Sequence, residues 1–175
     1  MSIEIKISKR RISYKIAMKF LHKRVEKVKA NKGRELLWIL EHPTTFTAGI
    51  RSKDNEIIDK RINIIKTNRG GKITLHNPGQ KIIYFVMDLN KRKRDIRRLI
   101  KTIEKSIIEF LRTCKIQAKS DKKNIGIWVS GKKIAAIGVR VSKWIAYHGF
   151  SINVDTDLNK YDAIIPCGIK DKGVT

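Results

Sequence analysis

Two runs of alternating apolar and polar residues meet at Ser130 and Gly131, and this arrangement leaves few folds open other than a β-sheet. The runs lie in the stretch GIWVSGKKIAAIGVRVSKWIAYHGFSINVDTDLNKYDAIIPCG, residues 126–168. Alternation of this kind is typical of strands, and a glycine in a short connection supplies the positive φ that a tight hairpin needs. A second long strand is expected over roughly 144–154. The stretch therefore predicts several strands of one sheet.

The rest of the chain adds strands and two helices. Apolar runs predict further strands over 3–7, 35–41, 62–67, 73–75 and 82–89. A first helix is expected from Ser13 to a stop at Gly33, and a second over 95–113 with Asp95 as its cap. Residues 43–49 are expected to form a loop and 51–61 a surface excursion. The fold class predicted is α+β, a mixed or antiparallel sheet with packed helices.

Apolar residues at helical spacing define the core stripe expected for each helix. The first stripe is Ile16, Ala17, Phe20, Leu21, Val25 and Val28, and the second is Leu99, Ile100, Ile103, Ile107, Phe110 and Leu111. Trp38, Trp128 and Trp144 are also expected in the core.

The length of 175 residues suits a single domain over 1–175, and 41% hydrophobic residues favour a folded chain. No apolar run approaches the roughly 20 residues that a membrane span needs, and the N-terminus lacks the apolar segment of a signal peptide. We therefore expect a cytoplasmic protein with no membrane partner. Its two cysteines are expected to be reduced thiols rather than a disulfide.

The charge balance is strongly basic, with 40 Lys and Arg against 16 Asp and Glu, a net +24. Nucleic-acid binding is one interpretation of such a charge. The lysines, however, are spread along the whole chain instead of forming one arm or stripe. A solvated surface with a compositional bias explains the same numbers.

Cys167 lies between a proline and a glycine, just after an apolar run. Pro166 fixes φ and removes a backbone donor, while Gly168 lets the chain bend sharply and lets a substrate approach without meeting a Cβ atom. Such a setting exposes a reactive side chain. Cys167 is therefore the leading candidate for a nucleophile. Cys114, at the end of the second helical stripe, is expected to be a small buried hydrophobe.

Five blocks of the sequence resemble the lipoyl(octanoyl) transferase family in order and in spacing. They are RGGKITLHNPGQ (69–80), GKKIAAIG (131–138), YHGF (147–150), Asn153 with TDL (156–158), and PCGI (166–169). EHP (41–43) followed by FTAG (46–49) is similar to an N-terminal block of that family. The resemblance covers nearly the whole chain and is far more specific than one short motif.

This resemblance implies an octanoyltransferase of lipoate biosynthesis, with the architecture of the biotin and lipoate protein ligase catalytic domains. The octanoyl group would arrive on the phosphopantetheine of acyl carrier protein, pass through a cysteine thioester, and end on a lysine of lipoyl domains. The acceptors implied are the lipoyl domains of 2-oxoacid dehydrogenase and glycine cleavage complexes. ATP is not expected as a cofactor, because an amide is more stable than a thioester, and no metal is expected either. The basic surface would attract these acidic partners.

The family pattern implies a catalytic pair, Cys167 and Lys133. A thiol attacks as the thiolate, so a cation close to it is needed. Neighbouring residues on a strand point to opposite faces, so only one of Lys132 and Lys133 can reach the site. Because apolar residues follow Lys133 at alternate positions, we expect Lys133 to face inward and Lys132 to face water. The same lysine, once desolvated, would act as the base for the incoming amine.

The resemblance also implies the substrate-binding residues. They are Arg69, Gly70, Gly71, Lys72, Ile73, Thr74, Leu75, His76, Ala136, Ile137, Gly138, Gly149, Phe150 and Ser151. Glycines make room for an acyl chain, and backbone donors beside them would hold a thioester oxygen as its charge develops. His76 is expected to position the substrate rather than transfer a proton.

Two alternative functions stay open on the sequence. An ATP-dependent lipoate-protein ligase of similar fold would activate its acid as an adenylate and would not need the thiol. A basic nucleic-acid-binding module would bind with an affinity that falls steeply with salt and would be indifferent to loss of Cys167. No metal site is expected, because His42, His148 and Cys167 lack a compact ligand spacing. Family members generally continue beyond the position of Thr175, so we expect either a truncated C-terminus or a sequence that covers only an ordered portion.

Overall fold

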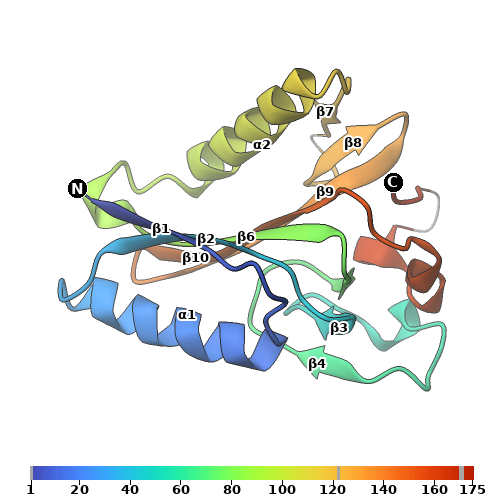
Figure 1. Cartoon of the computed structure of the whole chain (residues 1–175), viewed down its shortest axis with the longest axis horizontal. Helices are drawn as coiled ribbons and strands as arrows, with labels where there is room; N and C mark the ends of the chain where they lie inside the picture. Colours follow the sequence, from blue (N-terminus) through green and yellow to red (C-terminus); the bar gives the residue numbers. More distant parts are fainter. Residues whose placement is uncertain (1, 122, 170–171) are drawn as a thin grey trace.

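A mixed seven-stranded sheet with one helix on each face forms the framework of the protein (Figure 1). The computed structural model describes residues 2–121, 123–169 and 172–175. In spatial order the strands are β1 (Ile3–Ile7), β2 (Glu35–Leu40), β6 (Gln80–Asp88), β10 (Ile145–Asn153), β9 (Lys132–Ser142), β8 (Ile127–Val129) and β7 (Lys119–Ser120). Only the edge pair of β1 with β2 is parallel, and the other pairs are antiparallel. The predicted α+β fold class is confirmed.

A second, three-stranded sheet lies beside the N-terminal end of α1 (Figure 1). Its order is β4 (Ile64–Lys66), β3 (Thr45–Ala48) and β5 (Ile73–His76). The prediction of a loop over 43–49 was therefore wrong in its second half. β3 is held by long-range partners, β4 in parallel and β5 in antiparallel register. Such a short strand depends on its neighbours more than on its own composition.

The first helix, α1 (Tyr14–Lys29), begins as predicted at Ser13, whose side chain accepts a hydrogen bond from the Ile16 amide at 3.4 Å. It ends earlier than predicted. Asn31 takes the left-handed conformation with φ 55°, as asparagine does more readily than most residues, so Gly33 is not the cap. Ile16 is 63% exposed and does not belong to the core stripe.

The second helix, α2 (Ile96–Thr113), is capped by Asp95, whose carboxylate accepts from the Arg98 amide at 2.9 Å. It buries a narrow stripe, of which the fully buried members are Ile103, Ile107 and Leu111. Phe110 is 52% exposed and Cys114 is exposed, so both predictions of burial were wrong. These residues lie beyond the edge of the stripe that faces the sheet.

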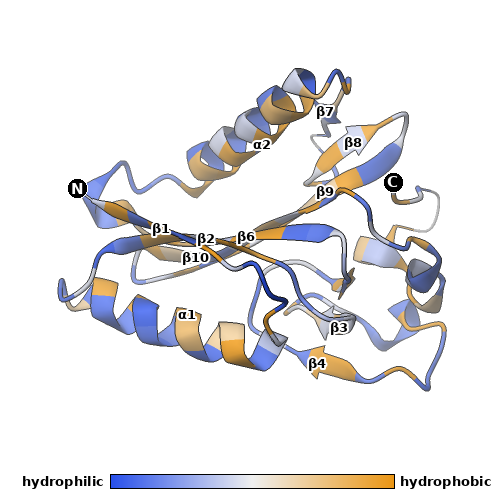
Figure 2. Cartoon of the chain, in the orientation of Figure 1, coloured by the Kyte–Doolittle hydropathy of each residue, from blue (hydrophilic) through white to orange (hydrophobic). Residues whose placement is uncertain are grey.

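Each face of the large sheet carries its own apolar core, and apolar residues line the inner sides of the helices (Figure 2). The α1 core includes Leu21, Leu36, Trp38, Val86 and Tyr147. The α2 core includes Phe85, Ile107, Ile127 and Ala146. Trp38 and Trp128 are buried as predicted, whereas Trp144 is only partly buried. Within the residues described, neither helix has the length and apolarity to span a membrane.

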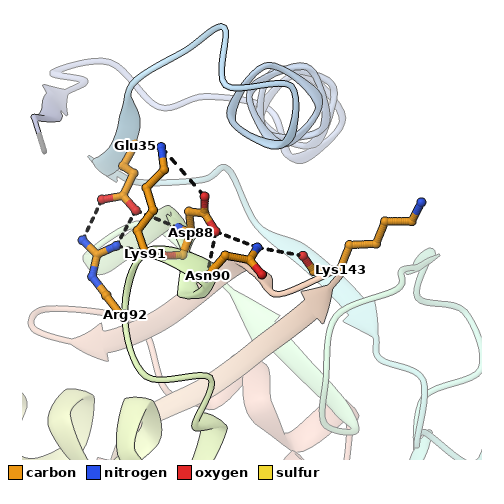
Figure 3. Close-up of polar contacts among 6 residues, drawn as sticks. All are labelled: Glu35, Asp88, Asn90, Lys91, Arg92 and Lys143. Carbon is orange, nitrogen blue, oxygen red and sulfur yellow. Dashed lines mark hydrogen bonds and ion pairs between the residues drawn. The ribbon is translucent and has the colours of Figure 1, made fainter.

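An ion pair ties the start of β2 to the segment that follows β6 (Figure 3). Arg92, just after the short helix η2 (Leu89–Lys91), donates through both terminal nitrogens to Glu35, with an Nη2–Oε2 distance of 2.7 Å. The Asp88 amide donates to the same carboxylate at 2.7 Å. Burial alone would raise the pKa of Glu35, but these hydrogen bonds and the Arg92 charge hold it below its usual value.

The connection between β8 and β9 is the predicted tight hairpin. Ser130 and Gly131 have φ of 47° and 80°, the pair of positive values expected of a type I′ turn. The apolar residues before Cys167, in contrast, form no strand. The chain there makes two short helices, η3 (Asn159–Ala163) and η4 (Pro166–Gly168), and Ile164 forms a single β-bridge with Ile57. This bridge draws the excursion 51–61, which contains η1 (Asp54–Glu56), against the cysteine turn.

Candidate active site

Cys167 lies at the centre of η4, half-buried, with its backbone in the left-handed region at φ 57°. The turn is closed by hydrogen bonds from the Gly168 amide to the Ile165 carbonyl at 2.9 Å and from the Ile169 amide to the Pro166 carbonyl at 3.1 Å. A non-glycine residue in this region is strained, and such strain is concentrated at functional sites. The residue lines three adjoining cavities.

The first of these cavities lies between the Arg69-Gly70-Gly71 loop and strands β9 and β10. Every predicted substrate-binding residue lines it except Leu75. Leu75 is fully buried instead, in a small core with Ile73, Tyr161 and Ile164. The structure therefore brings thirteen of the fourteen predicted residues together around one cavity that also contains Cys167.

Lys133 lines the other two cavities together with Cys167. Its side chain is 7% exposed while Lys132 is exposed, as predicted. Its amine donates to the Ile125 carbonyl at 3.2 Å and lies 4.8 Å from the centre of the Trp128 ring. Trp128 is thus more than a core residue. Gly126, with φ 136°, is needed here, because a Cβ atom would lie 2.8 Å from the Ala135 carbonyl oxygen and 3.1 Å from Cε of Lys133.

Arg69 places a buried positive charge beside the main cavity. It is 8% exposed, and its guanidinium donates to the Thr47 carbonyl at 2.8 Å, the Thr47 hydroxyl at 2.9 Å and the Gly70 carbonyl at 3.0 Å. No carboxylate pairs with it in the described part of the chain. Burial lowers the pKa of Arg69, and a negative charge on Cys167 opposes that effect. A buried cation without a carboxylate partner can stabilise an anion that enters the cavity.

Lys72 and Glu56 form an ion pair at 2.7 Å next to the cysteine turn. The Glu56 side chain is only 4% exposed, and the Glu56 carbonyl accepts from the Ile165 amide at 2.8 Å. The excursion 51–61 thus holds η4 in place instead of being only a surface feature. Sequence reasoning missed Glu56, since nothing in the local pattern marks it.

The polar groups deeper in the cavity are neutral. Burial, with smaller effects from His42 and Arg69, lowers the pKa of His76 to about 3. Its Nδ1 donates to Oε1 of Gln80 at 2.9 Å, and Nε2 of Gln80 donates to the Tyr161 hydroxyl at 2.9 Å. Burial also raises the pKa of Tyr161 to about 12. A histidine held in this way suits positioning better than proton transfer at neutral pH.

Three further residues line the cavity that sequence reasoning did not select, namely Ile82, Tyr84 and His148. His148 stands inside the block 147–150 that carried the resemblance, so a signal was present. Ile82 and Tyr84 arrive through the pairing of β6 with β10, which places Tyr84 opposite Gly149. That register is not encoded locally. Among the described residues, no group of three or more His, Cys, Asp or Glu side chains could hold a metal ion.

Comparison with known proteins identifies the family to which the chain belongs. The model of the lipoyl protein ligase A/B catalytic domain matches residues 13–175. The octanoyltransferase of Wolbachia sp. subsp. Brugia malayi is 43% identical over 178 residues, covering 99% of this chain and 87% of that protein. The octanoyltransferase of Bartonella bacilliformis is also 43% identical, covering 99% and 78%.

Solved structures agree at the level of the fold. The crystal structure of lipoate-protein ligase A bound with ATP superposes with a TM-score of 0.75 at 16% identity, covering 98% of this chain and 75% of that one. The fold expected from the resemblance is therefore confirmed. The chain belongs to the lipoyl protein ligase A/B catalytic domain family and, within it, to the octanoyltransferases, which are enzymes.

Proposed function

We propose that this enzyme takes an octanoyl group from the phosphopantetheine thioester of acyl carrier protein onto Cys167 and passes it to a lysine of a lipoyl domain. The acceptors would be the lipoyl domains of 2-oxoacid dehydrogenase and glycine cleavage complexes. One observation carries the proposal: the strained turn places Cys167 at a cavity lined by the residues that the resemblance selected for substrate. Similarity to proteins named octanoyltransferase supports the acyl group.

The first step exchanges one thioester for another. The Cys167 thiolate attacks the carbonyl carbon of the octanoyl thioester, a carbon–sulfur bond forms, and the bond to the carrier sulfur breaks. The carrier leaves as a thiolate and takes a proton from the Lys133 ammonium, which becomes a neutral amine. The Arg69 and Lys133 charges favour the anionic sulfur before attack, since both residues line cavities that contain it.

The second step moves the acyl group to nitrogen. The neutral amine of the acceptor lysine attacks the Cys167 thioester, the new amide bond forms, and the cysteine thiolate is released. The proton lost by the amine passes to a base, and we assign this role to Lys133, which lines the adjoining cavity together with Cys167. The transfer is downhill, so the proposed reaction needs no ATP, and none of its steps as we propose them uses a metal. Both cysteines are free thiols, which suits the reducing cytoplasm where we propose the enzyme works.

The test is transfer of octanoyl from purified octanoyl-acyl carrier protein to an apo lipoyl domain, without nucleotide. We expect octanoylated acceptor with the wild-type chain and with Cys114→Ser, whose exposed thiol is the matched control. Cys167→Ser should form none. Transfer that requires ATP and survives Cys167→Ser would instead identify a ligase and overturn the proposal.

A further inference from the structure

The main cavity has a defined direction along strands β9 and β10. Ala136 and Ser151 face each other across these strands, and both also line the small cavity next to Cys167. Further along, Gly138 lies opposite Gly149, and His148 follows. The cavity therefore runs from the cysteine toward His148. At about 3.3 Å per residue, the three steps from Ser151 to His148 cover about 10 Å.

The end of the cavity away from Cys167 is closed by main chain. A Cβ atom on Gly70 would lie 2.6 Å from the Val139 carbonyl oxygen, so the loop backbone packs directly on β9. A Cβ atom on Gly138 would lie 3.4 Å from the Gly70 oxygen and 3.5 Å from Cδ of Arg69. Backbone cannot rotate aside as a side chain can. An acyl chain therefore cannot pass between the loop and β9 beyond this point.

The His148 ring is turned toward this closed end by its backbone. Its even-numbered neighbours on β10, Ala146 and Phe150, pack on the α2 side of the sheet. His148 instead has φ 66°, and its ring centre lies 4.9 Å from that of Tyr147 and 6.4 Å from that of Tyr84, both in the α1 core. The left-handed conformation is strained for histidine and breaks the alternation of the strand.

Asn68 fixes which nitrogen of this ring carries the proton. Nδ2 of Asn68 donates to the Tyr147 hydroxyl at 3.2 Å, which leaves Oδ1 to accept from Nε2 of His148 at 2.9 Å. Nδ1 of His148 is then a bare acceptor, buried and without a hydrogen-bond partner among the residues described. Burial, assisted by the charges of Arg69, His22 and Arg140, lowers the pKa of His148 to about 3, so the ring is neutral.

These features give the cavity apolar walls and a polar end. Ile73, Ile82 and Ala136 line its length. An extended hydrocarbon advances about 1.3 Å per carbon, because its bonds of about 1.5 Å zigzag, so eight carbons reach about 9 Å. A longer chain would bring a methylene group against Nδ1 of His148, and this contact would keep a polar nitrogen buried without a hydrogen bond. A shorter chain would leave apolar wall uncovered.

Resting on the function proposed above, we propose that His148, held by Asn68, and the contact of Gly70 with β9 form a stop that sets the acyl chain at about eight carbons. His148 is then a specificity-determining residue of the acyl site, and Asn68 a positioning residue that acts through it. Neither takes part in the bond-making steps.

Single-turnover acylation measured by intact mass tests this, with hexanoyl-, octanoyl-, decanoyl- and dodecanoyl-acyl carrier protein as donors. For the wild type we expect octanoyl to exceed hexanoyl about sixteenfold, from about fourfold per methylene. Decanoyl should also be slower than octanoyl. Gly138→Ala adds a methyl group at ordinary contact distances and should raise the hexanoyl-to-octanoyl rate ratio at least tenfold. His148→Gly tolerates the positive φ and should bring decanoyl to the octanoyl rate.

Ser142→Ala is the matched control, because Ser142 is exposed on the same strand outside the cavity. Its chain-length profile should equal that of the wild type. The stop is refuted if Gly138→Ala, or His148→Gly, is acylated with an unshifted profile. The two variants report independently, so misfolding of one leaves the other decisive. A wild-type chain that no donor acylates would defeat the proposed function itself.

Discussion

Five cationic side chains line the cavities that contain Cys167, and three of them, Arg69, Lys72 and Lys133, are held differently. Arg69 is buried without a carboxylate partner in the described part of the chain, and Lys72 is paired with Glu56 at 2.7 Å. The amine of Lys133 donates to a backbone carbonyl, which leaves its charge uncompensated there as well. Arg69 and Lys133 are therefore the cations to which we assign stabilisation of the Cys167 thiolate in the proposed reaction.

Replacing Lys133 by Met should slow the alkylation of Cys167 by iodoacetamide at pH 7 about tenfold, since a smaller fraction of the thiol would be ionised. The measurement is made in a Cys114→Ser background, so that only one thiol reacts. Lys132→Met is the matched control, because Lys132 is exposed and its loss should leave the rate unchanged. Equal rates for the two variants would remove Lys133 from thiolate stabilisation.

At the scale of the secondary-structure elements, polar contacts join the start of β2 to the end of β6 and to the segment that leads from β6 to α2. Glu35 is 5% exposed and accepts from Arg92 and from the Asp88 amide (Figure 3). Removing one partner of such a buried pair strands the other group without compensation. Mutation of this pair therefore measures how much the stability of the large sheet depends on the contact between Glu35 and Arg92.

Glu35→Gln should lower the free energy of unfolding by about 2 kcal/mol at pH 7, because charged hydrogen bonds to Arg92 and to the Asp88 amide are weakened. The loss is not larger because Arg92 is partly exposed, so water can solvate its charge. The folded-state pKa of Glu35 lies below its usual value of 4.5, so its contribution is complete above that pH and is lost as the pH falls through the folded value. Denaturant unfolding at pH 7 and below pH 4 should show the difference shrinking.

Lys143→Gln is the control for this variant. Only the backbone carbonyl of Lys143 joins the cluster, and its side chain extends away (Figure 3). Its unfolding free energy should match the wild type at both pH values. A Glu35→Gln difference that stays constant with pH would show that the carboxylate charge contributes nothing.

Features set by residues next to one another in the chain were predictable from the sequence, and features set by long-range contacts were not. The turn at Ser130 and Gly131 and the caps Ser13 and Asp95 depend on residues next to one another. β3 exists only because β4 and β5 flank it, so its sequence was taken for a loop. The exposure of Phe110 likewise depends on how α2 rotates over the sheet, which helical spacing does not fix.

In the whole molecule, the site is assembled from segments far apart in the chain. The loop 69–72, strands β9 and β10, and the turn η4 converge because β10 pairs with both β6 and β9 at the centre of the sheet. The family resemblance selected most of these residues in advance. It could not supply the closing contacts from Glu56 and Tyr84, since these depend on packing and register.

The net charge of +24 should act on the approach of an acidic carrier. Raising NaCl from about 50 to about 300 mM should lower kcat/KM for octanoyl-acyl carrier protein roughly threefold to tenfold, because salt screens long-range attraction. With octanoyl-pantetheine, an uncharged small donor, kcat/KM should hardly change. A similar fall in kcat/KM for both donors would show that salt acts on the active site and not on the association of the enzyme with acyl carrier protein.

The central claim is that Cys167 itself carries the acyl group between donor and acceptor. Intact mass of the enzyme, mixed with octanoyl-acyl carrier protein in the absence of acceptor, tests it most directly. We predict a mass gain of one octanoyl group in the wild type and in Cys114→Ser, removed by hydroxylamine and absent in Cys167→Ser. Octanoyl transfer to the acceptor at the wild-type rate by Cys167→Ser, with no acyl-enzyme formed, would contradict the account.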